Sequence, residues 1–176
     1  KAFAVGARRI THLYNGMKYS EEVLQAAQEA GNVYAEIICD GNHSTLTSLN
    51  VFFREKQEHG MMVTDSLMCK GYPVGSVFDF GGQDVEIYPD GSAHITTGKK
   101  QLAGSTLKFN EGLKILVERA LVPFEIAINA VSCNPCKYLR IDDHKGYIRT
   151  GYDADIVVLN DDYSVEQTFC LGKAQL

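Results

Sequence analysis

The 176-residue sequence has no cluster of lysine or arginine and no long apolar run. Seventeen basic against twenty-two acidic residues give a net charge of −5, which argues against nucleic acid or an anionic membrane as the main partner. No stretch approaches the roughly 20 apolar residues of a membrane span, and residues 1–9 lack the apolar centre of a signal peptide. These absences predict a cytoplasmic protein without nucleic-acid or membrane partners.

Cysteines are few and odd in number, and most lie inside apolar segments. Five cysteines of this kind are typical of reduced, buried thiols in a cytosolic protein. Cys133 and Cys136 form a CxxC pair, but they enclose Asn134-Pro135 and no second pair follows. The pair therefore predicts neither a zinc ribbon nor a redox centre.

The first two thirds of the chain alternate short apolar strands with helices. We expect strands at 10–13, 33–39 and 61–64, and helices at 21–30 and from Ser44 or Thr45 onward. Further helices are expected around 113–117, from Pro123 to Val131, and on to Leu139. Strands and helices with such short connections are typical of parallel βαβ units, so the predicted fold class is α/β.

Polar side chains follow each of the three predicted strands. His12, His43 and Asp65 each lie at or just beyond the carboxyl end of a strand. In barrel enzymes, catalytic groups collect at this face of the sheet. The repetition in three successive units predicts a functional site there.

Two later segments show sequence patterns that differ from those of the βαβ region. Apolar residues alternate on both sides of Pro89-Asp90-Gly91, which predicts an antiparallel hairpin insertion at about 76–98. The chain then returns through 102–105, which we interpret as a loop. At the end, Ile156–Leu159 and Val165–Leu171 are expected to be strands of a separate small sheet.

Five segments together resemble N-acetylglucosamine-6-phosphate deacetylases of the amidohydrolase superfamily, in their C-terminal half. These segments are Ile10–Met17, Asp40–His43, Val63–Asp65, Leu102–Leu107 and Gly151–Leu159. The resemblance implies the last three strands and helices of a TIM-type (β/α)8 barrel over residues 1–140, including the insertion. Residues 141–176 would supply the C-terminal strands of a small β-sandwich.

The resemblance also implies a metal-dependent hydrolysis of N-acetylglucosamine 6-phosphate to glucosamine 6-phosphate and acetate. A divalent metal lowers the pKa of bound water from 15.7 to about 7; zinc is the first expectation, with iron or another divalent ion as the alternatives. His12 matches the family's metal ligand and Asp65 its catalytic acid/base. The residues that match substrate contacts are Asn15, Gly16, His43, Leu102, Ala103 and Gly104.

Two features depart from the family pattern. The family carries an arginine that helps to bind phosphate shortly after Asn15, whereas residues 18–23 contain none; Lys18 supplies a charge without bidentate geometry. The family's other metal ligands, a Glu and a His, lie upstream of this sequence. The chain alone is therefore expected to be inactive and to associate through open strand edges.

Two alternatives stay open. The protein is another amidohydrolase that acts on an unphosphorylated N-acetyl amino sugar, or it is a non-catalytic half barrel that binds a sugar phosphate or a partner subunit. The family is often dimeric, which leaves a homo-oligomer open.

Overall fold

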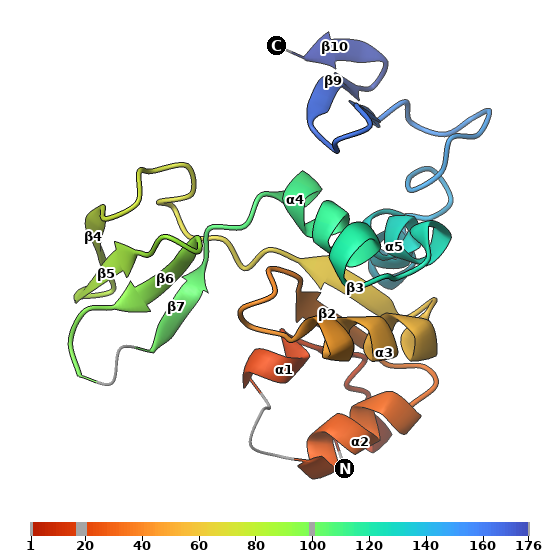
Figure 1. The fold of residues 1–176 in the computed structure, drawn as a ribbon. Helices are drawn as coiled ribbons and strands as arrows, with labels where there is room; N and C mark the ends of the chain where they lie inside the picture. Colours follow the sequence, from red (N-terminus) through yellow and green to blue (C-terminus); the bar gives the residue numbers. More distant parts are fainter. Residues whose placement is uncertain (1, 17–20, 99–100, 176) are drawn as a thin grey trace.

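The computed structural model describes residues 2–16, 21–98 and 101–175. Its strands form three separate sheets, one parallel and two antiparallel (Figure 1). Helices η1, α1, α2, α3, α4, η2, α5 and α6 span Phe3–Val5, Leu13–Gly16, Glu21–Glu29, Leu46–Lys56, Phe109–Lys114, Ile115–Arg119, Phe124–Val131 and Cys133–Leu139. Element η2 is a π-helical turn that continues α4. Among the described residues, every helix falls short of the length and apolarity that a membrane crossing demands.

The parallel sheet contains β1, β2 and β3 in chain order. Their bounds are Arg9–Ile10, Tyr34–Ile38 and Gly60–Val63. Both neighbouring pairs are parallel, with Ile10 beside Ala35 and Ile38 beside Val63, so all three carboxyl ends point to the same edge. The predicted parallel βαβ arrangement is confirmed.

The expected strand at 10–13 is wrong in its extent. The strand ends at Ile10, because His12 has a φ of 28° and cannot continue an extended chain. Leu13 is fully buried, as its apolar character predicts, but it begins helix α1 instead of ending a strand.

Helix α3 covers the sheet and forms the centre of the core (Figure 1). It begins after Thr45, whose hydroxyl oxygen accepts a hydrogen bond from the Ser48 N–H at 3.1 Å, as an N-cap does. Leu49, Phe52 and Phe53 are fully buried at helical spacing. Burial of each such side chain stabilises the fold by about 1.5–3 kcal/mol.

The second sheet is antiparallel and contains strands β4, β5, β6 and β7, at Val77–Phe80, Gln83–Ile87, Ser92–Ile95 and Leu102–Ser105. The predicted turn is confirmed: the Gly91 N–H donates to the Tyr88 carbonyl at 2.9 Å, and Gly91 adopts a φ of +78°. The expected loop at 102–105 is wrong, because these residues form β7 and pair with β6. The insertion is therefore a four-stranded sheet.

The third sheet contains β8, β9 and β10, at Ile156–Leu159, Val165–Cys170 and Lys173–Gln175, in antiparallel order. The chain that leads into β8 is held by the Lys145 ammonium. This group lies 2.8 Å from Asp153 Oδ2 and 2.5 Å from Asp155 Oδ2. These hydrogen bonds raise the pKa of Lys145. Asp155 also accepts from the Leu171 N–H at 2.8 Å. The Gly151–Leu159 segment thus joins this sheet to the loop after α6.

The cysteines are all free thiols. Three are buried, Cys136 is half-buried and Cys170 is exposed on β9. In the CxxC pair, the Cys133 thiol donates to the Gly146 carbonyl at 3.0 Å. Cys133 therefore helps to hold the loop that follows α6.

Candidate functional site

The segment after β1 places His12 with one ring nitrogen in the interior. His12 has a φ of 28°, and its carbonyl accepts from the Asn15 N–H at 2.9 Å as the chain turns into α1. Its Nδ1 atom is buried and has no hydrogen-bond partner in the part of the chain that the structure describes. A buried polar atom of this kind normally has a partner, so His12 Nδ1 is suited to a group from outside these residues.

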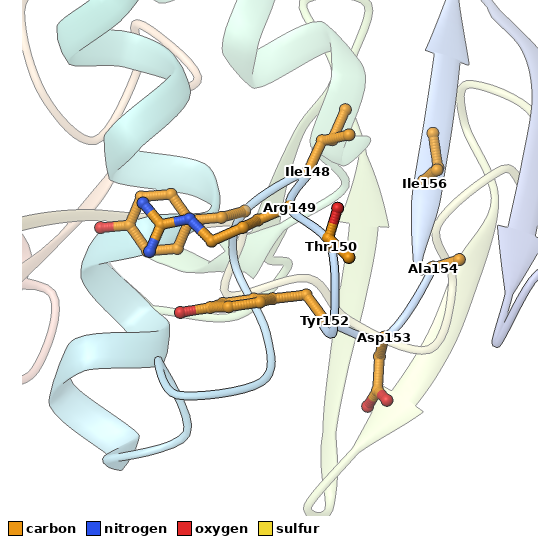
Figure 2. Close-up of a pocket in the computed structure, with 8 residues that line it drawn as sticks. Ile148, Arg149, Thr150, Tyr152, Asp153, Ala154 and Ile156 are labelled. Atoms are coloured by element: carbon orange, nitrogen blue, oxygen red, sulfur yellow. The ribbon is translucent and has the colours of Figure 1, made fainter.

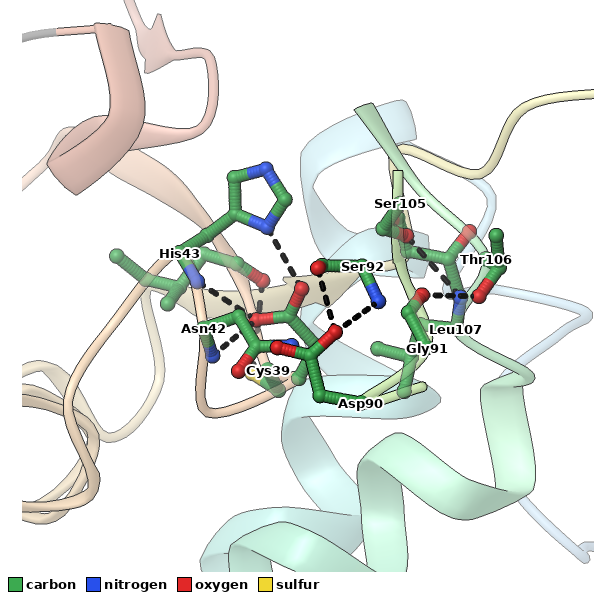
Figure 3. A network of polar contacts seen from close by, with 12 residues as sticks. Cys39, Asn42, His43, Asp90, Gly91, Ser92, Ser105, Thr106 and Leu107 are labelled. Carbon is green, nitrogen blue, oxygen red and sulfur yellow. Dashed lines mark hydrogen bonds and ion pairs between the residues drawn. The ribbon is translucent and has the colours of Figure 1, made fainter. Parts of the chain in front are cut away.

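The segment after β2 forms a tight loop around the Asp40 carboxylate (Figure 3). Oδ1 accepts from the Asn42 N–H at 2.8 Å and from the His43 N–H at 2.9 Å, while Oδ2 lies 2.6 Å from His43 Nδ1. Burial raises the pKa of Asp40, but these hydrogen bonds outweigh burial and hold the pKa below its ordinary value. Asp40 is therefore an ionised acceptor at neutral pH.

The segment after β3 presents Asp65 to solvent. Asp65 is exposed, has a φ of 47°, and its carbonyl accepts from the Ser105 N–H at 2.9 Å. Non-glycine residues with such backbone angles are uncommon, and they concentrate at functional sites where the surrounding structure holds them. His12 and Asp65 share this feature, and both directly follow strands of the parallel sheet.

Among the described residues, the buried side-chain polar atoms without a partner all follow strands of the parallel sheet. In the described ranges, the only ones on side chains are His12 Nδ1, His43 Nε2 and Ser66 Oγ. One of them follows each of the three parallel strands. The structure therefore brings the predicted residues His12, His43 and Asp65 to one edge of the sheet, together with Ser66, which the sequence did not single out.

Strand β7 runs directly beside Asp65. The Ser105 hydroxyl donates to the Thr64 carbonyl, and the Leu67 N–H donates to the Ser105 carbonyl at 2.8 Å. Gly104 has a φ of +69°, and a Cβ added there would lie 2.9 Å from Leu67 side-chain atoms and 3.1 Å from the Asp65 carbonyl oxygen. The predicted substrate-contact segment 102–104 thus lies against Asp65 as a strand. Ser105, which fixes this approach, was missed because only its neighbour Gly104 carries a sequence signal.

Replacing Gly104 with alanine is expected to lower the free energy of unfolding by about 2 kcal/mol, since it adds left-handed strain and a clash with Leu67. The activity of the intact protein should fall as well, because Asp65 shifts with its carbonyl. Gly98→Ala is the matched control: Gly98 has the same φ of +69° but nothing within 4 Å of its added Cβ. Equal losses in the two variants, measured by urea unfolding, would show that the close contacts of Gly104 with Leu67 and Asp65 are unimportant.

The remaining predicted residues lie in the short helix α1. Asn15 is half-buried, and Gly16 is the last residue of that helix. Lys18, the predicted substitute for the family arginine, lies outside the described residues.

The described residues do not complete a metal site on their own. His12 offers a buried ring nitrogen and Asp65 an exposed carboxylate, whereas a catalytic zinc usually has three protein ligands. Within the described ranges, no group of three or more His, Cys, Asp or Glu residues is arranged to hold a metal ion. The chain thus fits a divalent metal only as one contributor to its ligand set.

A separate hollow of about 280 Å³ lies in the segment between α6 and β8 (Figure 2). The guanidinium carbon of Arg149 lies 5.3 Å from the ring centre of Tyr147 and 5.5 Å from that of Tyr152. None of the predicted site residues lines this hollow. It is therefore distinct from the strand-end site.

Comparison with known proteins identifies relatives of the whole chain. The sequence pattern of the Amidohydrolase family matches residues 7–174. The N-acetylglucosamine-6-phosphate deacetylase of Bacillus subtilis (strain 168) is 36% identical, over 97% of this chain and 43% of that enzyme. The crystal structure of the Thermotoga maritima deacetylase of the same name is 28% identical, with a TM-score of 0.88 over 98% of this chain and 47% of that one.

A third relative was solved with a ligand. A mutant of the Mycobacterium smegmatis deacetylase, in complex with N-acetyl-D-glucosamine-6-phosphate, is 25% identical, with a TM-score of 0.87 over 98% of this chain and 46% of that one. The chain thus spans less than half the length of these relatives, and over that part it has their fold. Since the family pattern covers nearly all of its residues, the chain belongs to the amidohydrolase family.

Proposed function

We propose that the intact protein hydrolyses N-acetylglucosamine 6-phosphate to glucosamine 6-phosphate and acetate, in the cytoplasm. The observation that carries this proposal is a set of buried side-chain polar atoms, one after each parallel strand, that have no partner among the described residues and lie on the same side of the sheet as the exposed Asp65. Two relatives that match the whole chain are named for this activity, and a third was solved with this sugar phosphate.

In this proposal, β1, β2 and β3 are the last three strands of a (β/α)8 barrel, and residues 141–176 contribute strands to a small β-sandwich. In the described residues, the outer edge of β1 has no strand beside it. An open edge of a parallel sheet leaves N–H and C=O groups unpaired, which favours further strands of the same barrel there. The same unpaired edge would allow two copies of an incomplete chain to associate.

Asp65 acts as the general base and then as the general acid. Its carboxylate takes a proton from the attacking water as the C–O bond forms, and it delivers that proton to the amide nitrogen as the C–N bond breaks. The products are acetate and the free amine. The exposure of Asp65 and the hydrogen bond that fixes its backbone support this role, since the carboxylate is reachable while its anchor is rigid.

The sugar phosphate is held by groups on both sides of Asp65. His43 binds the acetyl carbonyl or a sugar hydroxyl through Nε2, which is buried and lacks a partner among the described residues. Asn15 and the Gly16 backbone bind from α1, and the main chain of Leu102, Ala103 and Gly104 binds from β7. The close approach of Gly104 to the Asp65 backbone carbonyl supports this assignment, since it brings β7 near the residue proposed as acid/base.

Members of the amidohydrolase family generally depend on a divalent metal ion. His12 would be a ligand in this chain, and further ligands would come from the rest of the protein. The metal supplies a nucleophile at neutral pH and polarises the carbonyl. We propose zinc, with iron or another divalent ion as the alternatives.

The test is acetate release by the intact protein from N-acetylglucosamine 6-phosphate and from N-acetylglucosamine. We expect kcat/KM to be at least about tenfold higher for the phosphorylated sugar, since one hydrogen bond to a charged group contributes about 1.5–3 kcal/mol. Removal of metal by a chelator should abolish the activity, and added Zn²⁺ or Fe²⁺ should restore it.

Each competing function predicts a different result in this assay. Equal or faster hydrolysis of the unphosphorylated sugar would indicate another amidohydrolase specificity, which the absence of arginine from residues 18–23 makes a real alternative. No hydrolysis of either sugar by the metal-loaded protein would leave a binding role.

A further inference from the structure

The two oxygens of the Asp40 carboxylate have separate contacts, which involve Asn42 and His43 (both labelled in Figure 3). Oδ1 accepts the backbone N–H groups of Asn42 and His43 and so closes the turn after β2. Oδ2 is left for the His43 ring, whose Nδ1 lies 2.6 Å away. This pair is well shielded, with side-chain exposures of 9% for Asp40 and 0% for His43.

The donor and acceptor capacities of Asp40 and His43 determine which nitrogen of the His43 ring carries a proton. An ionised carboxylate accepts only, so His43 Nδ1 must be the donor in this contact. The proton of a neutral ring is then on Nδ1, and Nε2 is the nitrogen directed away from Asp40. Nε2 is buried and has no partner within the described residues. A buried, unprotonated nitrogen that is oriented in this way is suited to accept a hydrogen bond from a donor group of a ligand.

We propose that Asp40 is a positioning residue: it holds the His43 ring with the proton on Nδ1 and thereby presents Nε2 as an acceptor to a hydroxyl group of the substrate. The acetyl carbonyl, which only accepts, is then excluded as the partner of Nε2. This inference rests on the proposed function for the identity of the substrate. It gives Asp40 a role in turnover beyond closing the turn.

Asp40→Asn separates the two roles of the side chain. An asparagine oxygen still accepts the two backbone N–H groups, and asparagine closes such turns as well as aspartate does. That requirement fixes the amide orientation and turns its NH₂ group toward the ring. The NH₂ group donates to Nδ1, so the ring proton must move to Nε2. The loop is kept while the ligand-facing nitrogen changes from acceptor to donor.

The first readout is the nitrogen-15 NMR spectrum of histidine-labelled intact protein, with His43→Gln used to assign the signals. We expect His43 to be protonated at Nδ1 in the wild type and at Nε2 in Asp40→Asn. Asp162→Asn is the matched control, because Asp162 Oδ1 closes an exposed turn by accepting from the Ser164 N–H at 2.8 Å. It should leave the His43 signals unchanged. A wild-type ring protonated only at Nε2 would overturn the proposal.

The second readout is kinetic. Asp40→Asn should lower kcat/KM by about 10- to 100-fold, the usual effect of removing a residue that orients a functional histidine. In a His43→Gln background, the same substitution should cause no further loss, since Asp40 acts through His43. Independent losses that multiply in the double variant would overturn the proposal. If the wild type releases no acetate, the proposed function fails, while the NMR signals still decide the position of the proton.

Discussion

Replacing Asp65 with asparagine is expected to lower kcat of the intact protein by about 10³-fold, within the range that general acid–base catalysis contributes. The asparagine amide cannot take up the proton from water or return it to the leaving nitrogen. The substitution should leave the fold intact, because asparagine is among the few residues that accept a left-handed backbone like that of Asp65, with its φ of 47°. Initial rates of acetate release and the unfolding midpoint measure the two effects.

The backbone at this position makes the choice of variant important. Asp65→Ala would remove the carboxylate but would also strain a left-handed residue, and the Ser105 N–H bond to its carbonyl would shift with it. A loss of activity would then have two causes. Asp161→Asn, on the exposed turn between β8 and β9, controls for the change in charge and should leave kcat unchanged. Near-normal activity of Asp65→Asn would refute the proposed mechanism.

The sequence predicts the regular elements well wherever one periodicity dominates. Helix α3 is an example, because its cap at Thr45 and its buried face follow directly from local pattern. The predicted strand at 10–13 is wrong because of a single backbone angle. The apolar Ile10 and Leu13 at its two ends suggest one continuous strand, but the φ of 28° at His12 interrupts it, and no propensity scale anticipates that angle for a histidine.

The site, too, is predictable where local sequence pattern decides its geometry and unpredictable where it does not. The positions of His12, His43 and Asp65 at strand ends depend on the parallel order alone, so the sequence was sufficient. The contact of Asp40 with His43 depends on the shape of one loop, and that of Ser105 with Thr64 depends on a strand that enters from another sheet. Such contacts are set by tertiary structure, and Gly104 within β7 gives no local strand signal because glycine is a poor strand residue.

The second large effect is expected from a buried asparagine with no role in the chemistry. Asn134, at the start of α6, is 1% exposed. Its Nδ2 donates to the Gln57 carbonyl at 2.7 Å and to the Gly60 carbonyl at 2.8 Å. One amide therefore joins α6 to the end of α3 and to the first residue of β3. Gln57 has a φ of 30°, so this contact also holds the chain as it leaves α3.

Asn134→Ala should lower the free energy of unfolding by about 3 kcal/mol, because two acceptors lose their partner in a site closed to water. Asn134→Asp should be at least as damaging, since it directs a carboxylate oxygen at those same carbonyls. Asn160→Ala is the control: its Nδ2 donates to Ser164 Oγ at 3.0 Å on an exposed turn, where water replaces the lost partner. Urea unfolding of the intact protein at fixed metal content measures all three. A loss below about 1 kcal/mol for Asn134→Ala would mean that water reaches the two carbonyls, and that α6 is held by its apolar contacts alone.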